Sequence, residues 1–179
     1  VSPEQIKAKI RTVADWPVAP VRFRDITTIL EDPECYTYLV DWMLNLARQY
    51  RVEVVAGIDA RGFLFAGALA YQLKLPLVLI RKKGKLPYRT FSENYTLEYG
   101  EAAVEIHEDS IAGQKRALLI DDLVATGGTL EAACRLLRKS GIQSIHVASV
   151  IDLPELGGSH RMQSQVESLD CLCSFTESE

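Results

Sequence analysis

Apolar residues along the chain follow two rhythms, and each rhythm predicts a different kind of element. Uninterrupted apolar runs of strand length alternate with longer segments in which apolar residues recur at helical spacing. The order strand, helix, strand occurs twice, over residues 52–81 and again over 117–152. Strands that are apolar throughout suit a parallel sheet covered on both faces. The pattern therefore predicts the α/β class, with a twisted, mostly parallel sheet flanked by helices.

The N-terminal segment carries signals for a helix. Residues 2–5 have the pattern of a capping box, with proline at the first helical position. Ile6, Ile10 and Val13 then recur at helical spacing. We therefore predict one helix that continues until Pro17 interrupts it.

The segment between the two strand–helix–strand units does not fit the alternation. Residues 81–109 lack a helical pattern, contain Gly84 and Pro87, and end in the alternating stretch 103–108. Long irregular insertions in compact domains are usually functional lids or disordered tips. We interpret this segment as a flexible hairpin, or flap, inserted into a single domain that spans residues 1–179.

Composition narrows the function classes. The chain has 179 residues, of which 47% are hydrophobic and 25% charged, as in ordinary globular proteins. Its net charge of −4 argues against a general nucleic-acid-binding protein, which needs a broad basic surface. We expect no membrane span and no secretory segment, because no apolar run suits either. Because its 4 cysteines include no CxxC pair, we expect free thiols, no metal site built by the protein, and a cytoplasmic location.

The stretch LLIDDLVATGGTLEAA, residues 118–133, carries the clearest chemical signal. An apolar strand ends in two adjacent acids, and a small turn then leads into a helix. The unpaired N–H groups and the dipole of a helix N-terminus favour an anion, above all a phosphate. The turn lacks the lysine of a P-loop and the three spaced glycines of a dinucleotide-binding loop. The predicted phosphate cradle consists of Ala125, Thr126, Gly127, Gly128 and Thr129.

The two acids, Asp121 and Asp122, indicate a sugar beside that phosphate. Adjacent carboxylates repel each other, whereas the vicinal hydroxyls of a ribose donate hydrogen bonds to them. Neighbouring strand residues point to opposite faces, so both acids serve one ligand only if the strand ends there. Alternatively, one acid binds the ribose and the other orients the loop or a metal-bound water. Acids and cradle together predict a ribose phosphate.

Two further loops bring basic residues to the same edge of the sheet. Arg61 follows the first core strand, and its planar guanidinium together with neighbouring amides suits a pyrophosphate. A basic run, RKKGK, follows the next strand. Ligands of open α/β sheets bind beyond the carboxyl ends of the strands, so both loops face the predicted ribose phosphate. The predicted pyrophosphate site comprises Asp59, Ala60, Arg61, Arg81, Lys82 and Lys85.

These motifs occur together in a known family. LLIDDLVATGGT resembles the phosphoribosyl-pyrophosphate (PRPP) motif of type I phosphoribosyltransferases. The segments FRDITTIL, GIDARGFLF, LIRKKGKLP and TLEYG extend the resemblance to the adenine phosphoribosyltransferases, over residues 10–152. The resemblance implies the type I fold and a reaction of adenine with PRPP that gives AMP and pyrophosphate. It also implies magnesium carried by PRPP and a homodimer.

The resemblance also implies where adenine binds. Residues 1–30 would form a small base-binding hood, in which Phe23 stacks on the purine. The backbone at Arg24 would read the hydrogen-bonding edge of the base, and Leu123 would pack opposite. In the family, the loop after the first core strand contains a cis peptide bond, which would fall at residues 59–60.

Catalytic roles follow from the resemblance alone. It implies that Glu98 exchanges a proton with the adenine ring nitrogens and that Tyr99 helps to close the flap over the site. Arg61 completes the implied catalytic set. The resemblance further implies that Arg81 reaches the site of a dimer partner.

Two other functions stay open on the sequence. A phosphoribosyltransferase for hypoxanthine, guanine, xanthine or orotate would use the same sugar–phosphate site, although FRDIT and TLEYG argue against it. A non-catalytic regulator that senses PRPP would usually carry an added nucleic-acid-binding module. The acidic balance and the length of the chain disfavour such a module.

Overall fold

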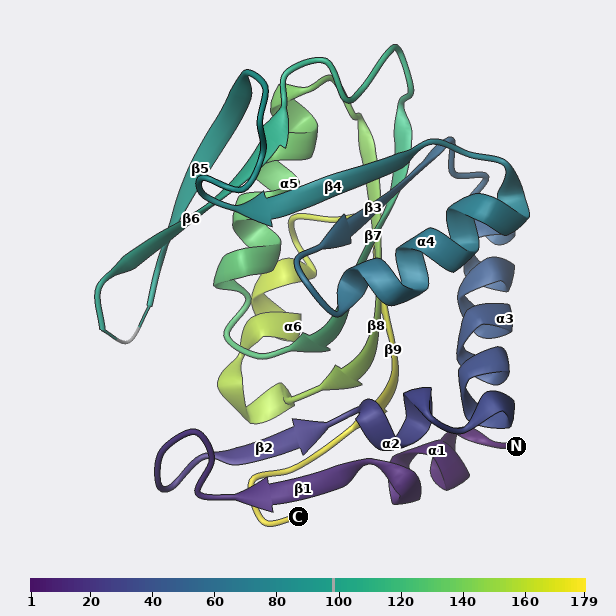
Figure 1. Ribbon diagram of the computed structural model, residues 1–179, viewed down its shortest axis with the longest axis vertical. Coiled ribbons are helices and arrows are strands. Elements are labelled where there is room, and N and C mark those ends of the chain that lie inside the picture. Colours follow the sequence, from purple (N-terminus) through teal and green to yellow (C-terminus); the bar gives the residue numbers. More distant parts are fainter. Residues whose placement is uncertain (98) are drawn as a thin grey trace.

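The centre of the molecule is a seven-stranded sheet, seen in a computed structural model that describes residues 1–97 and 99–179 (Figure 1). The strand order is β5-β6-β4-β3-β7-β8-β9. Five neighbouring strands of this order run parallel to one another, namely β4, β3, β7, β8 and β9. Among the strands of the described residues, only the β5–β6 hairpin joins the sheet antiparallel. The predicted α/β class with a mostly parallel sheet is confirmed. The strands of this sheet are β3 (Val54–Ile58), β4 (Leu77–Lys82), β5 (Thr90–Thr96), β6 (Glu101–His107), β7 (Arg116–Val124), β8 (Ser144–Asp152) and β9 (Ser168–Ser174).

Helices cover both faces of the sheet and bury two apolar layers. Figure 1 shows α3 and α4 on one face and α5 and α6 on the other. Strand alternation supplies both layers, because Ile120 of β7 packs on the α3–α4 side and Leu119 on the α5 side. No helix in the described part of the chain is both long and apolar enough to cross a membrane. The helices are α1 (Pro3–Lys9), α2 (Thr27–Leu30), α3 (Pro33–Gln49), α4 (Gly62–Leu73), α5 (Gly128–Lys139) and α6 (Gly158–Met162), with a short 3₁₀ helix, η1 (Pro154–Leu156).

The N-terminal segment corrects one prediction. α1 begins with the expected capping box but ends at Lys9, so the prediction of a helix that continues to Pro17 is wrong. Val13 instead lies in β1 (Arg11–Ala14), which pairs antiparallel with β2 (Arg22–Asp25) in a separate two-stranded sheet. Pairing with β2 gives the backbone of β1 its hydrogen-bond partners, and this tertiary pairing overrides the local helical spacing.

The insertion over residues 81–109 contains the predicted hairpin. β5 and β6 pair along their whole length. Ion pairs hold the hairpin against α5: Glu93 of β5 lies 3.1 Å from Arg135 and 3.4 Å from Lys139. The hairpin is thus anchored to the helix that follows the predicted phosphate cradle. Its flexibility stays a prediction.

Candidate active site

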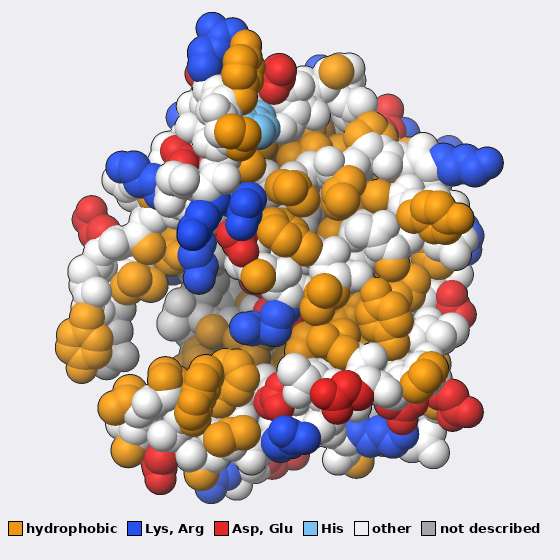
Figure 2. Space-filling model, viewed as in Figure 1, with side chains coloured by type: hydrophobic (Ala, Val, Ile, Leu, Met, Phe, Trp, Pro, Cys, Tyr) orange, Lys and Arg blue, Asp and Glu red, His pale blue; other side chains and the backbone are white. Residues whose placement is uncertain are grey.

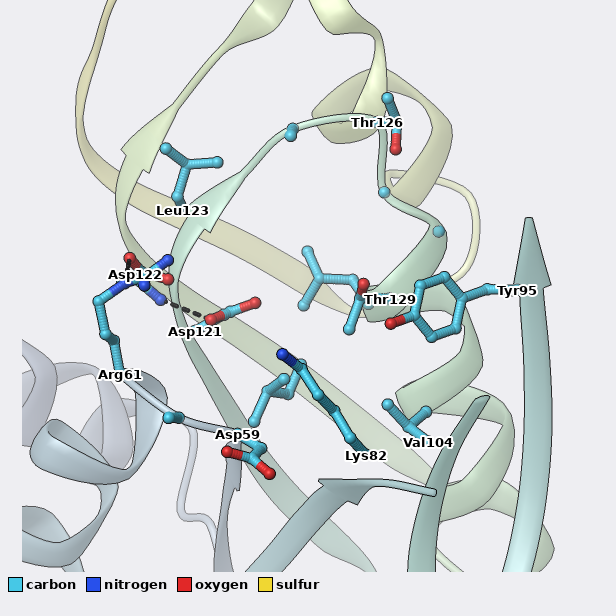
Figure 3. A pocket seen from close by; sticks show the side chains of 16 residues that line it. Asp59, Arg61, Lys82, Tyr95, Val104, Asp121, Asp122, Leu123, Thr126 and Thr129 are labelled. Atoms are coloured by element: carbon cyan, nitrogen blue, oxygen red, sulfur yellow. Dashed lines mark hydrogen bonds and ion pairs between the residues drawn. The ribbon is translucent and has the colours of Figure 1, made fainter. Parts of the chain in front are cut away.

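A cavity of about 330 Å³ opens at the carboxyl ends of β3, β4 and β7 (Figure 3). The loops after β3 and β7 form two of its walls, and the hairpin contributes a third. This edge is where ligands bind in open α/β sheets. The lining residues are Ile58, Asp59, Ala60, Arg61, Lys82, Tyr95, Val104, Asp121, Asp122, Leu123, Ala125, Thr126, Gly127, Gly128, Thr129 and Leu130.

The loop after β7 is shaped by close backbone packing. Gly127, the N-cap of α5, has φ +90°, a left-handed conformation that favours glycine. Beneath it, Gly158 donates its N–H to the carbonyl oxygen of Ala125 at 3.0 Å. A Cβ on Gly158 would lie 2.3 Å from that oxygen, so only glycine fits. No side chain in the described residues caps α5, which leaves its first N–H groups to a ligand.

The strand that carries the two acids is longer than predicted. β7 continues through Leu123 to Val124, so the prediction that it ends at Asp121 and Asp122 is wrong. The cause is continued pairing with β8, which carries the ladder past both acids. The acids consequently meet different neighbours. Asp122 is buried and accepts a 2.5 Å hydrogen bond from Nε of Arg61, whereas Asp121 is half-buried and points into the cavity (Figure 3). This geometry favours the alternative in which one acid meets the sugar and the other orients the site.

The cavity is set up electrostatically for an anion. Burial and the adjacent Asp122 carboxylate raise the pKa of Asp121 well above its ordinary value, with the Arg61 cation offsetting part of this. Lys82 points into the same space and forms no ion pair with any described residue (Figure 3). Lys82 and the uncapped N-terminus of α5 face the cavity together, so a phosphate-bearing ligand suits it.

Arg61 connects this cavity to the N-terminal segment. It is the N-cap of α4. That helix can approach β7 closely because Gly62 has no side chain: a Cβ there would lie 2.5 Å from the carbonyl oxygen of Ile120. The guanidinium of Arg61 bonds Asp122 on one side and lies 5.7 Å from the ring centroid of Phe23 on the other. Arg61, which the sequence predicts to bind pyrophosphate, is thus paired with Asp122 in this structure.

Several predicted residues lie beside the cavity and do not line it. The Arg81 guanidinium bonds Asp59 at 3.2 Å, and Lys85 is exposed on the following turn. Tyr99 is 88% exposed on the hairpin connection. Phe23 and Arg24 lie in β2, and the predicted acid–base residue Glu98 lies outside the described residues.

The remaining predicted residues line the cavity together. The cis peptide bond implied between Asp59 and Ala60 is present in its wall. Four lining residues were missed from the sequence: Ile58, Tyr95, Val104 and Leu130. The sequence did contain a signal for Tyr95. Alternation along β5 puts Tyr95 on the same face as Phe91, and both residues pack toward α5.

Comparison with known proteins fixes the family. A sequence profile of the phosphoribosyl transferase domain matches residues 25–170. The adenine phosphoribosyltransferase of Marinobacter nauticus is 49% identical over 172 residues, with 96% of each chain covered. The chain belongs to the adenine phosphoribosyltransferase family. The predicted resemblance is confirmed.

Solved structures agree with this membership. The adenine phosphoribosyltransferase of Rhodothermus marinus has a TM-score of 0.89 at 39% identity, covering 97% of this chain and 98% of that chain. The Giardia lamblia enzyme, crystallised with 9-deazaadenine, has a TM-score of 0.91 at 27% identity and covers 98% of each chain. The predicted type I phosphoribosyltransferase fold is therefore confirmed.

Stability measurements separate the two acids. A raised carboxyl pKa stabilises the folded state below the ordinary value of 3.8, and that stability is lost as the pH rises through the folded pKa. Asp121→Asn should therefore raise the free energy of unfolding at pH 7. The matched variant Asp122→Asn should lower it, because Arg61 loses its carboxylate partner. Urea denaturation at several pH values measures both. A lower stability for Asp121→Asn at pH 7 would contradict the assignment.

Proposed function

We propose that this protein transfers the phosphoribosyl group of PRPP to adenine, giving AMP and pyrophosphate, as a step of purine salvage. The observation that carries the proposal is one cavity in which Asp121, Lys82 and the uncapped N-terminus of α5 face the same space (Figure 3). A sugar that bears phosphates at both ends needs such a combination. Family membership supplies the identity of the base.

The proposed binding mode places each part of PRPP against a different wall. The 5′-phosphate would accept hydrogen bonds from N–H groups at residues 126–129, helped by the hydroxyls of Thr126 and Thr129. The ribose hydroxyls would donate to Asp121, which faces the cavity. The pyrophosphate would lie against Lys82 and the loop of residues 59–61.

The proposed reaction is a displacement at the anomeric carbon. A ring nitrogen of adenine forms a bond to that carbon while the bond to the pyrophosphate oxygen breaks, and the electron pair leaves with pyrophosphate. The transition state has oxocarbenium character, so a fixed charge pattern that also keeps out water lowers the barrier. Lys82, which faces the leaving group, would stabilise the negative charge that develops there.

Adenine is proposed to bind between β2 and the end of β7. Phe23 would stack on the purine, the backbone at Arg24 would read its edge, and Leu123 would pack on the other side. The position of Arg61, between the Phe23 ring and Asp122, supports this proposal because it makes the base site adjacent to the ribose site. Tyr99 and Glu98 would close over the base from the hairpin.

Magnesium is proposed to enter with PRPP and to neutralise its phosphates. Mg²⁺ retains several waters and is usually held by one or two carboxylates plus substrate phosphates. The donor set fits this mode because Asp121 offers one carboxylate directed into the cavity (Figure 3). That carboxylate would accept a hydrogen bond from a metal-bound water.

A homodimer is proposed through the outer face of α4 and β4. Large apolar side chains are exposed there, and Figure 2 shows hydrophobic side chains gathered over this side. An apolar face of this kind is typical of a subunit interface. The implied reach of Arg81 into the partner's site stays a prediction, and Lys85 is proposed to act beside it. The exposed apolar residues of this face are Leu64, Tyr71, Leu77 and Leu79.

A cytoplasmic location is also proposed. All four cysteines are free, and Cys35 and Cys134 are buried in the core. Burial raises the pKa of the Cys134 thiol to about 12, so the thiol stays protonated and unreactive at neutral pH. Unpaired core thiols suit a reducing compartment.

A pyrophosphate-release assay tests the proposed function. With PRPP and magnesium, adenine should give a kcat/KM at least about 100-fold above that of hypoxanthine, guanine, xanthine or orotate, because a site built to bond one purine edge leaves polar groups unpaired with another. Removing magnesium with a chelator should abolish the reaction. Release with another base only would favour the alternative phosphoribosyltransferases, and no release with any base would favour the PRPP-sensing regulator.

A second prediction addresses Glu98. Glu98→Ala should lower kcat by about 10²-fold or more, the usual contribution of a general acid or base, while the Kd for AMP stays within about threefold. The matched control is Glu101→Ala, an exposed acid at the start of β6, which should leave kcat unchanged. Steady-state kinetics and calorimetric titration with AMP measure the two quantities. Full turnover in Glu98→Ala would remove its proposed role.

A further inference from the structure

The C-terminal segment, residues 175–179, lies outside the catalytic cavity and packs on the N-terminal hood. Figure 1 shows this end of the chain beside β1. We propose that the segment positions β2, and that Arg24 and Phe175 are positioning residues for adenine binding. This inference rests on the proposed function, because it concerns the base site of that reaction.

The hood needs such support because it is not built into the main sheet. β1 and β2 form their own two-stranded sheet, so side-chain contacts decide where β2 lies relative to the cavity. Its outer connection exposes Trp16 and Val18, which are 51% and 65% accessible. A short hairpin of this kind is marginally stable unless it packs against another element.

The two faces of β2 point to different parts of the molecule. Phe23 faces the site side, where its ring lies 4.6 Å from that of Trp16 and 5.7 Å from the Arg61 guanidinium. Arg24, the next residue, points to the opposite face and is 5% exposed. Because the two residues are adjacent in the backbone, a displacement of Arg24 also displaces Phe23.

Arg24 is held by the C-terminal segment. Its guanidinium lies 4.2 Å from the ring centroid of Phe175 and donates to the carbonyl oxygen of Thr176 at 3.3 Å. A further hydrogen bond, of 2.6 Å, goes to the hydroxyl of Thr12 in β1. No described carboxylate pairs with Arg24, so the aromatic face and these oxygens are what compensate a buried cation.

The segment itself is fixed at several points. The Phe175 N–H donates to the carbonyl oxygen of Asp152 at the end of β8, which ties the segment to the main sheet. The centroid of the Phe175 ring also lies 4.9 Å from the Lys7 ammonium in α1. Lys7 in turn pairs with Glu179 at 2.6 Å. The Phe175 ring thus contacts two cations of the hood, and its backbone connects the hood to β8, the strand that neighbours β7.

The first test is a kinetic one. Phe175→Leu keeps an apolar side chain but removes the aromatic face, and Arg24→Met keeps the apolar stem but removes the guanidinium. Each should raise the KM for adenine about fivefold, as expected for loss of one partly desolvated cation–π contact, and leave the KM for PRPP within about twofold. The conservative variant Phe175→Tyr keeps the aromatic face, so its KM for adenine should equal that of the unmodified protein. The matched control is Arg22→Met, an exposed arginine on the same face of β2, which should leave both constants within about twofold.

The second test does not depend on activity. The chain has 2 tryptophans, so a Trp42→Phe background leaves Trp16 of the hood as the only indole. Acrylamide quenching of Trp16 should increase by about a factor of two in Phe175→Leu and Arg24→Met if the hood is released, and not in Arg22→Met.

The two tests separate failure of this inference from failure of the proposed function. Unchanged adenine KM in an active Phe175→Leu enzyme, or equal losses for adenine and PRPP, would overturn the positioning role. If the unmodified protein releases no pyrophosphate with any base, the proposed function fails, and Trp16 quenching then decides alone whether the segment holds the hood. Unchanged quenching in both variants would overturn that contact as well.

Discussion

The site depends on a helix N-terminus that no described side chain caps, held at the end of a buried strand. A helix that begins without a cap forgoes stabilisation, because its first N–H groups lack partners. Close backbone packing makes this possible here: Gly158 supports the loop from below, and Gly62 lets α4 approach β7. The donors are therefore positioned before a ligand arrives, which is what binding and catalysis require of them.

The acids beside this N-terminus are likewise fixed in place before a ligand arrives. Asp121 is held near a second carboxylate and away from water, which disfavours its charged form. Arg61 neutralises Asp122 and leaves Asp121 directed to the cavity. The folded protein thus carries an unfavourable group at the point where a ribose would donate hydrogen bonds. Groups that lower the stability of the fold but serve ligand binding are expected at functional sites.

Much of the fold follows from local patterns, and the exceptions have tertiary causes. The apolar runs of β3 and β7 and the amphipathic spacing of α5 predict the parallel sheet and its cover. Pairing with β8 extends β7 past its acids, and pairing with β2 turns Val13 into a strand residue. Neither pairing is visible in a single segment of sequence. The phosphate loop could be predicted because glycines and a helix start suffice to define it, whereas Tyr95 reaches the cavity only through the folding of the hairpin.

A crystal structure of the protein with AMP tests the central claim most directly. The account predicts 5′-phosphate oxygens at about 2.7–3.2 Å from backbone nitrogens of residues 126–129, and ribose hydroxyls within the same range of the Asp121 carboxylate. AMP bound at another place, with the loop after β7 making no contact to the phosphate, would contradict it.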